Sequence, residues 1–84
     1  MKLYILTINR GYYDDNETII KGVYDSLSNA VNAQNKCHKE MLDVNAKHPK
    51  NTNSSKYWEY RTKNRQYIEF NNFHIIEVEL NKTL

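Results

Sequence analysis

The run from Lys2 to Asn9 is built from aliphatic, β-branched and aromatic residues, and it restricts the fold more than any other part of the chain. Successive residues of a strand point to opposite faces of a sheet. One face of this run would carry Tyr4, Leu6 and Ile8, and the other would carry Leu3, Ile5 and Thr7. Because both faces are apolar, the run predicts a central strand that is at least partly covered on both sides.

A hairpin partner and one long helix are predicted next. Between Arg10 and Glu17 the chain is rich in turn-forming residues, and a strand pattern resumes over Thr18 to Tyr24, so a hairpin with a long tip is expected. Ser26 and the aspartate before it can cap a helix. The apolar stripe of that helix would consist of Leu27, Ala30, Val31, Gln34, Cys37, Met41 and Val44. This spacing predicts about five helical turns that end before Pro49.

The remaining third of the chain is predicted to form short strands after a polar loop. The strand candidates are Tyr57 to Thr62, Gln66 to Phe70 and Phe73 to Leu80, with turns at Lys63 to Arg65 and at Asn71 and Asn72. The predicted fold is therefore α+β, with a single helix packed on an antiparallel sheet of three to five strands in the order β-β-α-β-β-β. Residues 1–84 are expected to form a single domain, because the chain is too short for a second core.

Three segments give the chain a resemblance to a known group of proteins. They are Lys2-Leu3-Tyr4-Ile5-Leu6, then Ile20-Lys21-Gly22-Val23-Tyr24-Asp25-Ser26 before a helix that contains Ala30, and finally Ile75-Ile76-Glu77-Val78-Glu79-Leu80. In these segments the chain resembles small uncharacterised bacterial and phage proteins with the order strand, strand, helix, strand. The resemblance covers residues 1–45 and 73–84, while Pro49 to Asn72 depart from it. It implies a fold and brings no activity.

Positive charge is concentrated between Lys47 and Arg65. This segment holds six basic residues and one acidic residue, Glu59, although the whole chain has a net charge of only +2. Aromatic residues are interleaved with the basic ones. The predicted binding surface consists of Lys47, Lys50, Lys56, Tyr57, Trp58, Tyr60, Arg61, Lys63 and Arg65. A positive surface attracts anionic partners and speeds their encounter with the protein.

Three interpretations of this aromatic and basic segment are open. It could bind a protein, because Tyr and Trp supply large contact areas and the cations match an acidic partner. It could instead bind nucleic acid, with Lys and Arg on phosphates and Tyr57, Trp58, Tyr60 or Tyr67 stacked on bases. In the third interpretation the aromatic residues pack the sheet, and the cations keep its exposed edge soluble.

Catalysis and metal binding receive little support, so the protein is expected not to be an enzyme and to need no cofactor. Cys37 lies on the apolar stripe, and adjacent helix positions would point Cys37 and His38 in different directions. The single cysteine and the histidines lack the spacing of a zinc site. Asp14, Asp15 and Glu17 suit a solvated hairpin tip better than a cation site.

The expected location is the cytoplasm, or the host cytoplasm if a phage encodes the chain. One cysteine and the lack of a signal-peptide or membrane-spanning pattern indicate this location. Frequent Asn, Lys, Ile and Tyr are typical of AT-rich bacteria and their phages. The sequence thus predicts a small phage-type accessory protein that binds and modulates an acidic host protein, with inhibition as the expected effect, and nucleic-acid binding is the alternative. No membrane partner is expected, and a homodimer could form through an edge strand.

Overall fold

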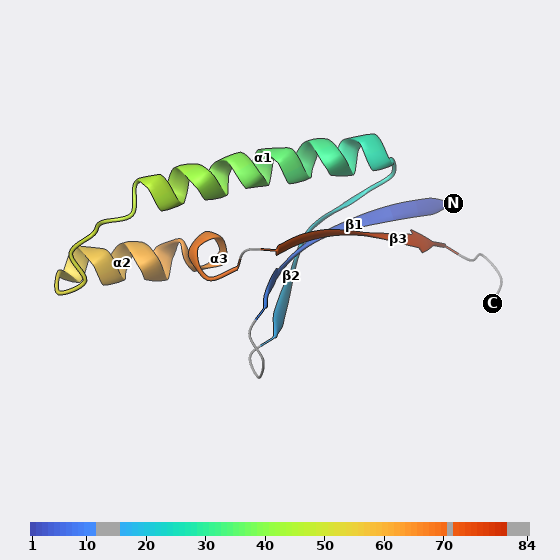
Figure 1. Cartoon of the computed structure of the whole chain (residues 1–84). Coiled ribbons are helices and arrows are strands. Elements are labelled where there is room, and N and C mark those ends of the chain that lie inside the picture. The colour runs from blue at the N-terminus through green and yellow to red at the C-terminus, as the bar shows by residue number, and fades with distance from the viewer. Residues whose placement is uncertain (12–15, 71, 81–84) are drawn as a thin grey trace.

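Within residues 1–11, 16–70 and 72–80, which the computed structural model describes, the chain forms three strands and three helices (Figure 1). The elements are β1 (Lys2–Arg10), β2 (Glu17–Tyr24), α1 (Leu27–Ala46), α2 (Ser55–Lys63), α3 (Arg65–Ile68) and β3 (Asn72–Glu79). The strands form one antiparallel sheet in the order β2-β1-β3. The predicted α+β class and the central position of the first strand are therefore confirmed. The predicted order β-β-α-β-β-β is wrong, because two helices replace the two extra strands.

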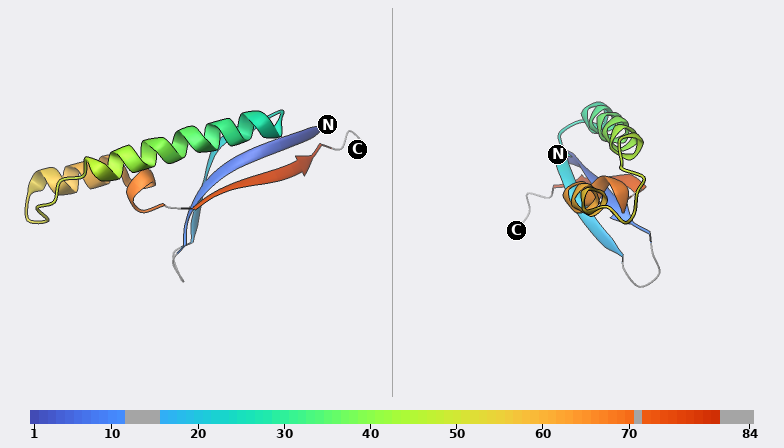
Figure 2. Two further views of the ribbon diagram at one scale, coloured as in Figure 1. Left: turned by 45° about the horizontal axis from the view of Figure 1, so that its top comes forward. Right: turned by 90° about the vertical axis from the view of Figure 1, so that its left-hand side faces the viewer.

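Helix α1 covers one face of the sheet, and the core lies between them (Figure 2). Leu6 and Ile8 of β1 are fully buried on this face. Their partners on β3, Ile75 and Phe73, share the face because directly paired residues of antiparallel strands point to the same side. The side chain of Gln34 on α1 donates a hydrogen bond to the carbonyl oxygen of Phe73 at 3.4 Å, which joins the helix to the sheet.

No helix of the described residues lies on the opposite face of the sheet, as Figures 1 and 2 show. The prediction that both faces of the central strand are at least partly covered is nevertheless confirmed for β1 itself, because Thr7 on this side is only 4% exposed and Ile5 is half-buried. A single long helix can cover only one face, and α2 and α3 lie beyond the end of the sheet instead of beneath it. We call the uncovered side the open face, which includes Leu3, Ile5, Thr7, Ile20, Val23, His74, Ile76 and Val78.

Helix α1 begins and ends where its capping residues predict. The side chain of Ser26 accepts a hydrogen bond from the backbone amide three residues later at 3.1 Å, and the helix ends before Pro49. The predicted stripe is confirmed at five of its seven positions, because Gln34, Cys37, Met41 and Val44 are half-buried and Ala30 is buried. Ala30 is fully buried, whereas Val31 is 37% exposed and Leu27 is also exposed. The buried stripe is therefore narrower than predicted.

The segments Tyr57–Thr62 and Gln66–Phe70, which were predicted as strands, belong largely to α2 and α3. Ser54 starts α2, because its side chain accepts a hydrogen bond from a backbone amide of the first turn at 3.2 Å. In a helix, Tyr57 and Tyr60 fall on one side and can pack together against α1. The preference of aromatic residues for strands depends on neighbouring strands, and none is available at this position.

The predicted turns can be judged only in part. Strands β1 and β2 pair as the expected hairpin, but residues 12–15 at its tip lie outside the described residues. The turn predicted at Lys63 to Arg65 is the junction between α2 and α3. Asn71 lies outside the described residues, and Asn72 already belongs to β3.

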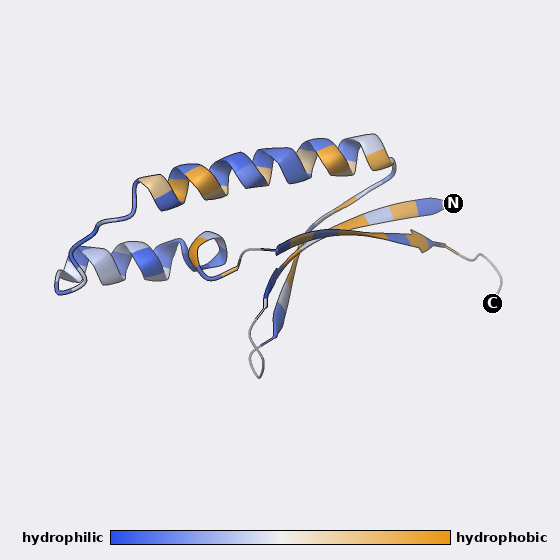
Figure 3. Cartoon of the chain, in the orientation of Figure 1, coloured by the Kyte–Doolittle hydropathy of each residue, from blue (hydrophilic) through white to orange (hydrophobic). Residues whose placement is uncertain are grey.

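The molecule is elongated, because α2, α3 and the end of α1 project beyond the sheet (Figure 1). Its extents are 56 × 28 × 17 Å and its radius of gyration is 15.9 Å. A compact domain of this length would have a radius of gyration of about 12 Å. We call residues 47–68 the helical arm. Figure 3 shows strongly apolar residues on the strands and on α1, whereas α2 is mostly polar.

Candidate functional site

Two arginines of the predicted surface are held in an ion-pair cluster at the base of the helical arm. Arg65 donates a hydrogen bond to the Glu69 carboxylate at 2.7 Å and lies 3.5 Å from Glu17. The Arg61 guanidinium lies 3.7 Å from Glu69, which also pairs with Arg10 at 2.7 Å. The cluster joins β1, β2, α2 and α3. Arg61 and Arg65 therefore hold the arm against the sheet.

Two tyrosines of the predicted surface also make internal contacts. The ring of His48 lies 4.5 Å from the ring of Tyr57 and 5.3 Å from that of Tyr60, measured between centroids. The Tyr60 hydroxyl donates a hydrogen bond to the carbonyl oxygen of Val44 at 2.8 Å. These contacts fix α2 against the end of α1. The interpretation in which the aromatic residues pack the sheet is therefore wrong for Tyr57 and Tyr60, although both are packing residues.

The predicted lysines stay on the outside of the molecule. Lys47 pairs with Asp43 one helical turn earlier at 3.1 Å, and both side chains are well exposed. Lys50, Lys56 and Lys63 are exposed and form no ion pair with another residue in the described part of the chain. Of the predicted surface residues, these three lysines and Trp58 are the ones that are exposed without an ion pair in the described part of the chain.

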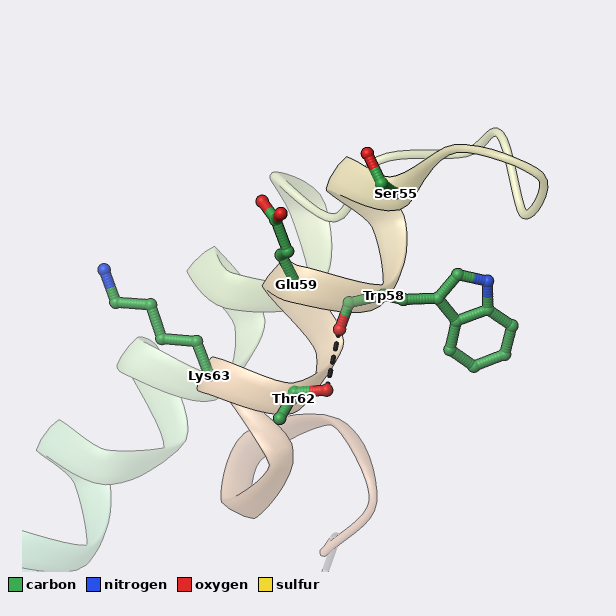
Figure 4. A pocket seen from close by; sticks show the side chains of 5 residues that line it. All are labelled: Ser55, Trp58, Glu59, Thr62 and Lys63. Atoms are coloured by element: carbon green, nitrogen blue, oxygen red, sulfur yellow. Dashed lines mark hydrogen bonds between the residues drawn. The ribbon is translucent and has the colours of Figure 1, made fainter.

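Trp58 projects from α2 on the side away from α1 (Figure 4). It is 54% exposed, yet its indole N–H donates a hydrogen bond to the carbonyl oxygen of Thr52 at 2.9 Å. An aromatic side chain that is already held in place loses little conformational freedom when it binds. The indole borders an open, mostly apolar pocket of about 640 Å³. The pocket is lined by Ser55, Trp58, Glu59, Thr62 and Lys63.

The outer side of α2 carries mixed charge. Lys56 and Lys63 are two helical turns apart and so lie on the same side of α2. Glu59 lies between them in the sequence and places a negative charge in the pocket wall. Trp58 projects from a different side of α2 than Lys63, as Figure 4 shows, and Ser55, Glu59 and Thr62 lie between them around the helix. A partner that meets both the indole and the lysines would therefore have to cover roughly half of the circumference of α2. We call Ser55, Lys56, Trp58, Glu59, Thr62 and Lys63 the Trp58 surface.

Tyr67, which the sequence offered as a base-stacking residue, is held between three elements. Its hydroxyl donates a hydrogen bond to Glu40 on α1 at 2.7 Å. The Lys21 ammonium on β2 donates to the same hydroxyl at 3.4 Å and lies 5.1 Å from the ring centroid. Burial, followed by the interaction with Glu40, raises the pKa of Tyr67 to about 12. These internal contacts make Tyr67 a structural residue.

The ion-pair cluster predicts a specific loss of stability in acid. Hydrogen bonding from Arg65, with further attraction from Arg10 and Arg61, lowers the pKa of Glu69 below its ordinary value of 4.5. The carboxylate therefore stabilises the fold fully above that ordinary value. We expect this stabilisation to be lost as the pH falls through the lower pKa of the folded state, which urea denaturation at a series of pH values would measure.

The matched variant for this prediction is Glu69→Gln. It should lower the free energy of unfolding at neutral pH by about 1–2 kcal/mol, because charge-assisted hydrogen bonds to arginine are weakened. Its stability should then fall less steeply in acid than that of the parent chain. Equal slopes for the two proteins in acid would show that Glu69 does not carry the effect.

The residues considered for catalysis or metal binding do not form a site in the described part of the chain. Cys37 is half-buried on α1, while the ring of His38 packs edge-on against Phe73 at 6.3 Å. Within residues 1–11, 16–70 and 72–80, no three metal-ligating side chains come together. Asp14 and Asp15 lie outside these ranges. None of the described helices has the length and apolar character to span a lipid bilayer.

Comparisons with known proteins add no further constraint. A scan against protein-family models, a search of curated proteins and a search of solved structures gave no match to this chain. The resemblance to small strand-strand-helix-strand proteins therefore stays a prediction.

Proposed function

We propose that this protein is a small accessory protein that binds an acidic partner protein through the Trp58 surface. The exposed and anchored indole of Trp58 is the observation that carries this proposal. Tryptophan is enriched among the residues that supply most of the binding energy at protein interfaces. The inhibition of a host protein, which the sequence predicts for a phage-type protein, would be the consequence of such binding.

The proposed partner has two chemical features. An apolar side chain would enter the pocket beside Trp58, because the pocket wall is mostly apolar. Carboxylates would meet Lys56 and Lys63, with Lys50 adding positive charge from the loop that precedes α2. The lysines have no competing ion pair among the described residues, so an acidic partner would not need to displace one.

The same geometry favours a protein over a nucleic acid. Single-stranded nucleic acids bind where several aromatic rings offer successive stacking positions along a basic groove. Of the four aromatic residues considered, only Trp58 is exposed for stacking, because Tyr57, Tyr60 and Tyr67 make internal contacts. Glu59 also lies in the pocket wall, where it would repel a phosphate.

The fluorescence of Trp58 provides the test, because it is the only tryptophan in the chain. An acidic peptide that contains leucine should shift the emission to shorter wavelength and protect the indole from acrylamide quenching. We expect the double substitution Lys56→Glu and Lys63→Glu to weaken this binding at least tenfold, because attraction becomes repulsion. The matched control reverses two exposed lysines on α1, Lys36→Glu and Lys39→Glu, and should bind as the parent does.

Two results would overturn the proposal. One is a single-stranded oligonucleotide that binds more tightly than the peptide, with an affinity that falls linearly on a logarithmic salt scale. This result would establish the nucleic-acid alternative. The other comes from a pull-down with nuclease-treated lysate of the cell that expresses the protein. If the Trp58→Ala variant captures every protein that the parent chain captures, the Trp58 surface does not bind the partner.

A further inference from the structure

The open face of the sheet exposes large apolar side chains on its two outer strands, β2 and β3. Ile20 is 63% exposed, Val23 is 55% exposed and Ile76 is 48% exposed. Val23 and Ile76 flank Ile5, and Ile20 lies opposite Thr7, so these residues form a continuous patch across the sheet. An antiparallel sheet that faces water normally presents polar residues on that side. The pattern is that of a surface that another layer covers.

This face also lacks charge. The remaining open-face positions that the strand pairing defines are Asn9, Thr18 and Asn72, which are uncharged polar residues, so His74 is the only titratable residue of this face in the described strands. The charged residues of the strands all lie on the side of α1 or α3, and they are Lys2, Arg10, Glu17, Lys21, Glu77 and Glu79. An acidic or basic partner would therefore find no complementary charge on the open face.

The chain exposes more surface than a compact protein of its size. Its accessible area is 6456 Å², whereas a compact monomer of 10.0 kDa would expose about 5,200 Å². The excess is about 1,200 Å², and a stable interface buries about 800 Å² on each partner. Only Leu6, Ile8, Ala30 and Phe70 are fully buried apolar residues in the described part of the chain. A second layer on the open face would enlarge this small core.

We propose that the open face binds the open face of a second copy of this chain. A two-fold axis near Ile5 would bring two identical, uncharged apolar faces together without electrostatic repulsion. The two sheets would then stack with their apolar side chains interdigitated, about 10 Å apart.

This arrangement differs from the edge-strand dimer that the sequence suggested. Pairing through an edge would leave the apolar patch in water. Of the two edge strands, β2 is irregular, because its register with β1 shifts between Leu6 and Thr7, whereas β3, the strand near which the sequence suggested pairing, is regular. The Trp58 surface lies on the helical arm, away from the open face, so the dimer would present two copies of it. The dimer does not depend on the proposed function.

The test measures the mass of the intact chain in solution over a range of concentrations by sedimentation equilibrium. We expect a dimer with twice the 10.0 kDa mass of one chain. Ile76→Lys should weaken dimerisation at least tenfold, because it places a charge in the apolar interface. The control is Leu42→Lys, which changes a similarly exposed apolar residue on α1 (56% exposed) and should leave the dimer intact.

A parent chain that is monomeric at every soluble concentration would overturn the proposal. So would a dimer that resists Ile76→Lys but is broken by proline in an edge strand, because that result would establish edge pairing. If Ile76→Lys fails to fold, methyl NMR of the unmodified chain decides the question. The methyl chemical shifts of Ile5, Val23 and Ile76 are expected to change with protein concentration. If these shifts do not change, the proposed dimer is contradicted.

Discussion

Replacing Ala30 with aspartate is expected to unfold a large fraction of the protein. Ala30 is fully buried where α1 meets the sheet, so the new carboxylate would lose its hydration without gaining a partner. We expect the free energy of unfolding to fall by at least about 3 kcal/mol. Because residue 30 lies near the start of α1, the helix dipole would stabilise the new carboxylate by only about 0.3–1 kcal/mol, which is too little to offset this loss. Urea denaturation followed by circular dichroism would measure the change.

The neighbouring substitution Val31→Asp is the matched control. It introduces the same charge one residue later on the same helix, at a side chain that is 37% exposed. The carboxylate can stay hydrated there, so a loss of less than about 1 kcal/mol is expected. If Val31→Asp were the more damaging substitution, α1 would face the sheet through the side that the apolar spacing first indicated, and the placement of Ala30 would be wrong.

The sheet and α1 were predictable because their signals come from long periodic segments. The alternation from Lys2 to Asn9 identified a central strand, and Ser26 and Pro49 marked the limits of the long helix. Two details were not predictable from these patterns. Apolar spacing placed both Ala30 and Val31 on the buried stripe without showing which of them is the more buried, and the alternation shows that a face is apolar without showing what covers it.

The helical arm was mispredicted because its local signals conflict. Aromatic residues between Tyr57 and Tyr60 favour a strand, whereas Ser54 is a helix cap and the two tyrosines are also spaced for one side of a helix. Contact with His48 decides in favour of the helix. A helical reading of the segment would have grouped Trp58 with Thr62, which lines the same pocket.

The candidate site was only partly predictable because ion pairs between distant parts of the chain cannot be read from local charge. Arg61 and Arg65 added to the positive segment in the sequence, but Glu17 and Glu69 neutralise them in the fold. The sequence did not separate Trp58, which is more than half exposed, from Tyr57 and Tyr60, which make internal contacts. The binding role of Trp58 stays a proposal.

Replacing Phe70 with alanine is expected to cause the second large loss of stability. Phe70 follows α3 and is 1% exposed, and its ring lies 5.1 Å from the Arg10 guanidinium. Removing a buried phenylalanine side chain costs about 3–5 kcal/mol through lost burial and the cavity left behind. Phe70 also ends the segment that returns from the helical arm to β3. We therefore expect urea denaturation to show a much lower midpoint for Phe70→Ala than for the parent chain.

Trp58→Ala is the matched control, because it removes a larger aromatic side chain from the same part of the chain. Trp58 is 54% exposed, so its loss should lower the free energy of unfolding by no more than about 1 kcal/mol. Phe70→Leu keeps most of the buried volume and should retain most of the stability. Equal denaturation midpoints for Phe70→Ala and the parent chain would show that Phe70 does not anchor the arm. If Phe70→Ala loses stability while Trp58→Ala keeps its stability and loses partner binding, the buried Phe70 holds the helical arm and the exposed Trp58 binds the partner.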